Sequence, residues 1–490
     1  MTAALFTADA LLPAGWARNV LLEWDAAGRF TQVRTDAPAP AGVPVAAGPV
    51  LPGLPNLHSH SFQRAFAGLT EFRGAAQDSF WSWRMLMYRF AAQVSPAQLE
   101  TIATWLYIEM LEAGYTSVCE FHYLHHDTDG RPYADDAELA LALLRAAERA
   151  GIGLTLLPVL YQASGFGGQP PSEGQRRFIR GTDSMLRLLE HLRPHCEAQR
   201  ARLGLAPHSL RAVPPDALRD ALAGLDAIDA TAPIHIHIAE QTAEVDACLV
   251  WSGQRPVAWL LDHAPVDGRW CLVHATHMDA DETRRAAASG AVAGLCPTTE
   301  ANLGDGIFDF GAWRAAGGGL DDPHARHGVS SLPPEGAAPA LGRPGGGAWG
   351  IGSDSHACVN AAEELMLLEY GQRLATHQRA IGADSTQREV ATALTLGAVR
   401  GGAQAVARAV DGLAAGQQAD FVVLDANHVA LHGLTAPQML SAHVFASHRT
   451  CAIDAVWVAG RAQVSAGRHA LHDEAAAAFV AARSALLSRE

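Results

Sequence analysis

The sequence predicts an α/β protein: a (β/α)8 barrel of the TIM type, joined to a small β-sandwich domain that both chain termini build together. Three observations predict this fold class. From Val50 onward, short strand-like runs alternate with helix-length amphipathic stretches, which is typical of β/α units around a parallel sheet. Eight candidate strands fall within about 300 residues, which suits such a barrel. Short apolar stretches separated by turns recur at both ends of the chain.

The first elements are expected in the N-terminal segment. Residues 1–49 alternate short apolar stretches with turns, and 37–49 are rich in Pro, Ala and Gly, which predicts small β structure followed by a linker. The barrel strands are expected at 50–57, 116–121, 153–160, 203–208, 233–239, 269–275, 290–296 and 348–353. Helical patterns between these strands include 97–113, 137–149 and 215–224.

Two helix-length stretches, 359–374 and 387–410, follow the last barrel strand. The runs 419–425 and 453–460 then have the composition of strands again. A β segment at each end of the chain predicts that the termini form one domain. We therefore assign 1–49 and 412–490 to the small β domain and 50–411 to the barrel.

One segment does not fit the alternation. Residues 316–347 are rich in Gly and Pro, show no periodicity and are long for a barrel connection. We expect an insertion loop here, either a flap over the active site or a disordered segment.

The composition limits the partners and the compartment. Of the 490 residues, 49% are hydrophobic and 18% charged, which indicates a globular chain, and the net charge of −15 argues against nucleic acid or an anionic membrane as partner. We find no apolar run of membrane-spanning length and no signal-peptide pattern. The seven cysteines are scattered without a C-x-x-C pair, as in a reduced protein. We expect a soluble, cytoplasmic protein.

The chain contains no lysine, so all 36 of its basic residues are arginines. A biased genome composition explains this bias, but the chemical consequence holds regardless. No lysine Schiff base, lysine nucleophile or carbamylated-lysine metal bridge is available.

Histidines and carboxylates stand at the ends of six of the predicted strands, where the catalytic residues of such barrels lie. They are His58 and His60, Glu120 and His122, His208, His235 with His237 and Glu240, His274 with His277, and Asp354 with His356. A single histidine near a strand end is more often a core residue than a ligand, but that explanation does not suit the whole set.

His58-Ser-His60 supplies the first part of a predicted metal site, since alternate side chains of a strand point the same way. His237 and Asp354 complete a set of three imidazoles and one carboxylate, which binds a divalent cation. His235 lies on the same side of its strand as His237. We prefer His237 as the ligand because Glu240, three residues later, could face the same cavity.

The same strand ends supply groups for hydrolysis. A bound metal lowers the pKa of a water towards about 7, and Asp354 could take a proton from that water. Glu240 could pass a proton to a leaving nitrogen, and His274 could orient the attacking water or the developing tetrahedral centre.

This pattern resembles the amidohydrolase superfamily, whose features appear here as His58-x-His60, His237, His274 and Asp354. The lack of lysine and the sequence His237-Ile-Ala-Glu240 imply its mononuclear, deaminase-like members. Finer motifs resemble the formimidoylglutamate deiminase family. They are Leu54-Pro-Asn-Leu-His-Ser-His-Ser-Phe-Gln-Arg-Ala-Phe-Ala-Gly-Leu69, Phe80-Trp-Ser-Trp-Arg84, Cys119-Glu-Phe-His-Tyr-Leu-His125, Ala206-Pro-His-Ser-Leu-Arg-Ala212, His237-Ile-Ala-Glu-Gln241 and Pro297-Thr-Thr-Glu-Ala-Asn-Leu-Gly-Asp305.

The resemblance implies hydrolysis of N-formimino-L-glutamate to N-formyl-L-glutamate and ammonia in histidine degradation, by a homodimer. It places Gln63, Arg84, Tyr123, His208 and Arg211 in substrate binding. Arg84 and Arg211 suit this role physically, because an arginine fork binds a carboxylate through two hydrogen bonds and this substrate carries two carboxylates. The 316–347 insertion is longer than the family leads us to expect.

Two rival functions stay open at this point. A related metal-dependent deaminase of a purine, pyrimidine or triazine ring would use the same metal set but would need aromatic stacking and no paired arginines. A non-catalytic barrel should have lost ligands, and none is missing. One Zn²⁺ ion is the predicted cofactor, although Fe²⁺ or Mn²⁺ would also fit three histidines and a carboxylate.

Overall fold

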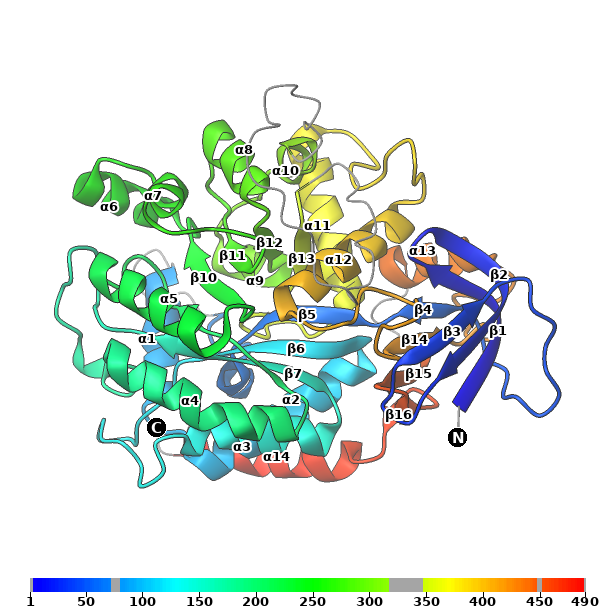
Figure 1. Cartoon of the computed structure of the whole chain (residues 1–490), viewed down its shortest axis with the longest axis horizontal. Helices are drawn as coiled ribbons and strands as arrows, with labels where there is room; N and C mark the ends of the chain where they lie inside the picture. The colour runs from blue at the N-terminus through cyan, green and yellow to red at the C-terminus, as the bar shows by residue number, and fades with distance from the viewer. Residues whose placement is uncertain (1–2, 72–79, 317–346, 447–451, 489–490) are drawn as a thin grey trace.

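A computed structural model of the chain describes residues 3–71, 80–316, 347–446 and 452–488 (Figure 1). Its central feature is a sheet of parallel strands. In sheet order these are β10 (Ile234–Ile238), β11 (Trp270–His274), β12 (Val292–Leu295), β13 (Trp349–Ile351), β5 (Leu54–Ser59), β6 (Tyr115–His122), β7 (Gly153–Leu160), and the short segments β8 (Arg202–Leu203) and β9 (Ala206–Pro207).

The sheet closes on itself. β13 pairs with β5 through Ile351 and Asn56, and a parallel bridge between Leu205 and Ile234 joins the β8–β9 segment to β10. The backbone N–H of His237 donates to the carbonyl of His208 across the same seam, at 3.1 Å. Closure with all strands parallel confirms the predicted (β/α)8 barrel.

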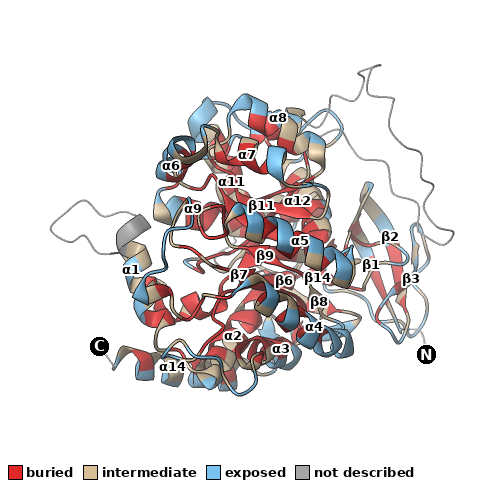
Figure 2. Cartoon of the chain, turned by 60° about the vertical axis from the view of Figure 1, so that its left-hand side comes forward, coloured by how far each residue is buried: buried red, intermediate tan, exposed pale blue. Residues whose placement is uncertain are grey.

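Helices surround the barrel and bury their apolar faces against it (Figure 2). They are α1 (Phe80–Ala91), α2 (Pro96–Glu112), α3 (Glu138–Ala150), α4 (Thr182–Ala198), α5 (Pro215–Asp229), α6 (Thr242–Ser252), α7 (Pro256–His263), α8 (Ala280–Ser289), α9 (Pro297–Leu303), α10 (Phe310–Ala316), α11 (Ala361–Thr376), α12 (Val390–Val406) and α13 (Ala436–Phe445), with 3-10 turns η1 (Ser61–Phe66) and η2 (Glu173–Gln175). Local sequence sets many of their ends. α2 begins at a capping box of Ser95 and Gln98 with Pro96 in its first turn, and α3 ends at Gly151 in the left-handed conformation.

The two ends of the chain form a separate sheet, as predicted. Its order is β17 (Arg468–His469), β16 (Arg461–Ser465), β15 (Ile453–Val458), β14 (Phe421–Leu424), β4 (Val50–Pro52), β1 (Ala3–Leu12), β2 (Gly15–Trp24) and β3 (Phe30–Arg34). A cluster of aromatic rings from both ends packs on it: Trp24 contacts Phe30, Phe421 and Trp457 at centroid distances of 6.4, 5.6 and 5.4 Å. The C-terminal helix α14 (His472–Leu487) returns to the barrel, where Phe479 stacks on Trp105 of α2.

The structure divides the run expected as one strand over 50–57. Val50–Pro52 joins the terminal sheet, whereas Leu54–Ser59 is the first barrel strand. Gly53 lies between them, and a Cβ atom there would lie 2.3 Å from the side chain of Thr116. A glycine therefore permits the close passage of the chain from one sheet to the other.

Some predictions fall at the edge of what the structure describes. The centre of the proposed insertion, residues 317–346, lies outside the described residues. The division at residues 49 and 412 stays a prediction. Within the described parts no helix is long and apolar enough to cross a membrane, and the six cysteines found there are free thiols.

Candidate active site

The polar strand ends meet at the carboxyl-terminal mouth of the barrel. His58 lies next to the end of β5 and His60 directly follows the strand, His237 lies near the end of β10, and His274 ends β11. Asp354 follows β13 in a left-handed backbone conformation with φ of +44°, and His274 has φ of +67°. Backbone strain of this kind is retained where the surrounding structure requires a side chain to point in one direction, as at many active sites.

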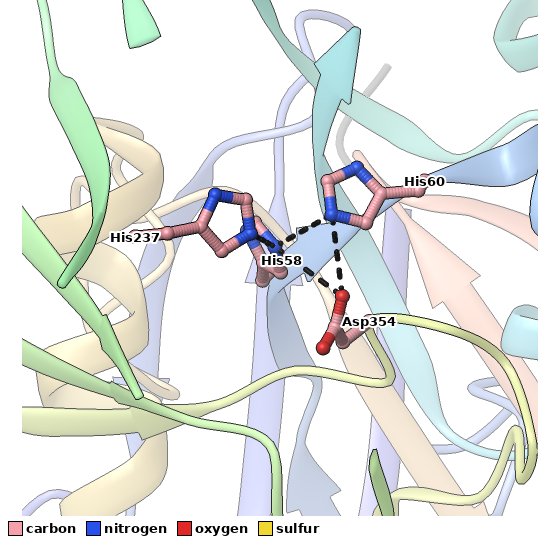
Figure 3. A group of neighbouring side chains, drawn as sticks. All are labelled: His58, His60, His237 and Asp354. Atoms are coloured by element: carbon pink, nitrogen blue, oxygen red, sulfur yellow. Dashed lines mark hydrogen bonds and ion pairs between the residues drawn. The ribbon is translucent and has the colours of Figure 1, made fainter. Parts of the chain in front are cut away.

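Four of these side chains form a metal-ligand cluster: His58, His60, His237 and Asp354 (Figure 3). The Nε2 atom of His58 lies 3.0 Å from Nε2 of His60 and 3.0 Å from Nε2 of His237. Oδ1 of Asp354 lies 3.4 and 3.3 Å from Nε2 of His58 and of His60. All four residues are buried.

Hydrogen bonds around the cluster orient two of its three histidines. Nδ1 of His60 donates to the carbonyl of Phe121 at 2.9 Å, and Nδ1 of His237 donates to the carbonyl of His208 at 3.1 Å. In the neutral rings the Nε2 atoms of both therefore present lone pairs to one point. A single N–H of His58 could satisfy only one of them. A divalent cation could accept electron pairs from all of these ligand atoms at once, so the four side chains suit a metal ion.

Burial supports the neutral, ligand form of the imidazoles. It lowers the pKa of His58 to about 3, and burial together with neighbouring imidazoles holds the pKa of His237 well below its ordinary value. Burial opposes the charge of Asp354, but the neighbouring imidazoles of His58, His60 and His274 outweigh this and hold its pKa well below the ordinary range. The cluster thus presents neutral nitrogens and an ionised carboxylate.

His235 is not part of this cluster. Its ring lies deeper in the barrel, where Nε2 donates to the carbonyl of Ala405 at 2.9 Å. Burial lowers its pKa to about 4. Of the two histidines on this strand, only His237 reaches the other three ligand candidates.

His274 and Glu240 lie beside the cluster. Nε2 of His274 is 3.8 Å from Oε1 of Glu240 and 3.7 Å from Oδ2 of Asp354, and its Nδ1 is 3.3 Å from Oε1 of Glu300. Burial disfavours the imidazolium, but the three carboxylates overcome this penalty and raise the pKa of His274 to about 10. Glu300 is a partner that the sequence analysis did not single out, although it belongs to the motif at 297–305.

One cavity extends outward from the cluster. Its walls include every predicted site residue except His58, which is fully buried: His60, Gln63, Arg84, Tyr123, His208, Arg211, His237, Glu240, His274 and Asp354. Nε2 of Gln63 donates to the hydroxyl of Tyr123 at 2.8 Å, which fixes both side chains on one wall. The ring of His208 lies against that of His237, at a centroid distance of 5.0 Å.

Arg84 and Arg211 stand at what we call the arginine end of the cavity, together with Tyr88 and Tyr161. Nη2 of Arg84 donates to the hydroxyl of Tyr161 at 3.1 Å, and its guanidinium lies 5.1 Å from the ring centre of Tyr88. Both tyrosine hydroxyls also accept hydrogen bonds from Nε2 of Gln175. The sequence analysis missed Tyr88, Tyr161 and Gln175. Only Tyr161 gave a usable signal, because it follows a predicted strand directly.

A buried carboxylate supports the loop of the first two ligands. Glu120, at the end of β6, accepts hydrogen bonds from Oγ of Ser59 and the backbone N–H of Ser61, both at 2.7 Å, and from the hydroxyl of Tyr107 at 3.1 Å. These bonds tie the side chain of Ser59 and the backbone of Ser61, on either side of His60, to the neighbouring strand. The geometry of the cluster is therefore fixed by the barrel itself.

Comparison with known proteins agrees with this geometry. The Amidohydrolase family matches residues 50–462, and the family described as Formimidoylglutamate deiminase HutF, N-terminal domain, matches residues 2–43. A formimidoylglutamate deiminase of Pseudomonas aeruginosa is 51% identical over 99% of both chains. An 8-oxoguanine deaminase of the same species is 27% identical over 79% of this chain and 77% of its own.

Solved structures give the same picture. A crystal structure of an amidohydrolase from Brucella melitensis aligns with a TM-score of 0.88 at 46% identity, covering 99% of this chain and 100% of the other. An adenosine deaminase from Xanthomonas campestris with bound zinc aligns with a TM-score of 0.75 at 20% identity, covering 99% and 98% of the two chains, which shows a shared fold alone.

Proposed function

The chain belongs to the amidohydrolase family and, within it, to the formimidoylglutamate deiminases, and from this we propose that it hydrolyses N-formimino-L-glutamate to N-formyl-L-glutamate and ammonia. It is a hydrolase of carbon–nitrogen bonds other than peptide bonds. One observation carries the choice of substrate. A single cavity is lined by three of the four metal-ligand candidates and by two arginines, as a substrate with a formimino head and two carboxylates requires.

The arginine end would hold the two carboxylates. Arg84 and Arg211 each offer a planar fork of donors, and charge-assisted pairs of this kind are the strongest hydrogen bonds a protein makes to a carboxylate. Gln63, Tyr123 and His208 line the same cavity as the arginines and the metal-ligand cluster. They would hold the middle of the substrate and place its formimino carbon next to the cluster.

His58, His60, His237 and Oδ1 of Asp354 would hold one divalent metal ion. We propose Zn²⁺, which suits three imidazoles and a carboxylate, although Fe²⁺ or Mn²⁺ accept the same donors. When bound, the ion would act as a Lewis acid and lower the pKa of the attacking water.

The chain's own residues would then move the protons. Oδ2 of Asp354, which faces His274 rather than the other histidines, accepts the proton of the attacking water as its oxygen bonds to the formimino carbon. Glu240 protonates the imino nitrogen, and His274, protonated among its carboxylate neighbours, stabilises the new oxygen substituent. As the tetrahedral species collapses, the hydroxyl proton passes to Glu240 and the carbonyl forms. The proton held by Asp354 passes to the amino nitrogen, the carbon–nitrogen bond breaks, and this nitrogen departs as ammonia.

The test is ammonia release by the purified, metal-loaded protein. We expect turnover of N-formimino-L-glutamate and none of guanine, cytosine or adenosine at equal concentration. Release from a ring substrate alone would favour the ring-deaminase reading, for which the aromatic rings of Trp83, Tyr88, Tyr161 and Phe178 in the cavity wall would supply stacking. No release from any of these, with metal bound, would leave the barrel as a binding module.

Two expectations complete the proposal. We place the protein in the cytoplasm, which the free thiols of the described cysteines support, and we propose a homodimer, as the resemblance implies. Light scattering coupled to size-exclusion chromatography measures the second directly, and a mass near 51.7 kDa, that of one chain, would contradict it.

A further inference from the structure

The turn between β10 and α6 carries the proposed acid of the reaction. Ala239 in this turn is left-handed, with φ of +51°, and Glu240 follows it. A second glutamate, Glu244 in the first turn of α6, is also buried. Its Oε2 accepts the backbone N–H of Glu240 at 3.1 Å, so this carboxylate closes the strained turn and fixes the position from which the Glu240 side chain extends.

The other oxygen of Glu244 faces the arginine end. Oε1 lies 3.9 Å from Nε of Arg211, with side-chain exposures of 2% for Glu244 and 15% for Arg211. Within the described part of the chain neither atom has a hydrogen-bond partner. The two groups therefore form a charge pair without a close hydrogen bond, and the Arg211 donors are not committed to Glu244.

We propose that Glu244 is a positioning residue that couples the carboxylate anchor Arg211 to the proton donor Glu240. This inference rests on the proposed function, which gives Arg211 and Glu240 their roles. A guanidinium with so little exposure needs a counter-charge, and a fixed one directs it. Because one carboxylate contacts both the anchor and the turn that carries Glu240, substrate docking and placement of the acid depend on the same side chain.

A purely structural role makes a different prediction. If Glu244 only stabilises the turn, its removal should lower the melting temperature and the active fraction without changing how Arg211 recognises a carboxylate. If it positions Arg211, its removal should weaken dicarboxylate binding, and only while Arg211 is present. A double-mutant cycle separates these two cases.

The experiment compares wild type, Glu244→Gln, Arg211→Gln and the double variant by calorimetric titration with glutarate, an unreactive dicarboxylate, and by kcat and KM for N-formimino-L-glutamate. Coupling between residues in contact corresponds to about 2- to 150-fold. We expect Glu244→Gln to weaken glutarate binding about tenfold and to lower kcat, with less than twofold further weakening in the Arg211→Gln background. Glu190→Gln, the same substitution at an exposed glutamate on α4, is the matched control and should change neither.

Each result decides the matter. Equal weakening in both backgrounds, or none in either, would overturn the coupling. Failure of the wild type to release ammonia while glutarate binds and the cycle is non-additive would reject the proposed reaction and keep the coupling. Absence of glutarate binding to the wild type would overturn both. If Glu244→Gln does not fold, Glu244→Asp serves in the same cycle, since it keeps the charge but withdraws it from Arg211.

Discussion

The two ends of the cavity are built in different ways. The metal-ligand cluster stands on strand ends of the barrel, and backbone carbonyls of the neighbouring strand ends orient two of its histidines. The arginine end stands on helix α1 and on the segment after β9, and side chains orient it: Tyr161 and Tyr88 beside Arg84, and Glu244 beside Arg211. Backbone carbonyls orient these two histidines whatever the side chains of Phe121 and His208, and the buried carboxylate of Glu120 supports the loop of His60 in addition. Side-chain support lets recognition change while the chemistry is kept, as the spread of substrates among related barrels requires.

We expect the largest loss of activity when Asp354 is replaced, because it is both a candidate metal ligand and the proposed base. Asp354→Ala takes a carboxylate from the metal-ligand cluster and leaves Nε2 of His58 and of His60 without their anionic neighbour. We expect loss of bound metal by elemental analysis and a fall in kcat of at least about 1000-fold. Asp216→Ala, an exposed carboxylate on α5, is the control. Full activity in Asp354→Ala would remove it from the site.

A smaller effect should separate acid catalysis from metal binding at the same end. Glu240→Gln keeps the shape of the side chain, and Glu240 is not one of the four metal-ligand candidates. The metal content should therefore stay near that of the wild type. Turnover should fall by about 100- to 10,000-fold, the usual contribution of a positioned proton donor. Glu197→Gln, on the exposed face of α4, controls for the substitution itself. Unchanged turnover would exclude Glu240 as the acid.

At the arginine end we expect a substitution to raise KM rather than to lower kcat. Arg211→Gln removes a charge-assisted contact worth about 1.5–3 kcal/mol, so KM for N-formimino-L-glutamate should rise about 10- to 150-fold. Metal content should be unaffected, because the cluster makes no contact with this side chain. Arg219→Gln, a surface arginine on α5, is the matched control. A loss of metal in Arg211→Gln would show that this arginine supports the metal-ligand cluster and does not act in substrate recognition alone.

The difference between the two ends of the cavity also explains which parts of the fold and the site could be predicted from the sequence. The fold class follows from the alternation of strands and helices, and the histidines at strand ends converge because the barrel brings every such end to one mouth. The division of 50–57 at Gly53 was not predictable, since the apolar run continues across it and only the approach of Thr116 requires the glycine. Gln175 was missed for another reason. Its side chain meets that of Tyr88 across 87 residues of sequence, and side-chain contacts of this range leave no local pattern.

The smallest effect tests whether side-chain support at the arginine end matters. The Tyr161 hydroxyl accepts a hydrogen bond from Arg84 and one from Gln175, so Tyr161→Phe removes the acceptor while keeping the ring. A single such bond contributes about 0.5–1.5 kcal/mol, so KM should rise about 2- to 12-fold at unchanged kcat and metal content. Tyr370→Phe, on α11 and away from the cavity, is the control. An equal fall in kcat would mean that Tyr161 acts on the reacting end as well, because recognition alone would alter binding and leave the chemical step intact.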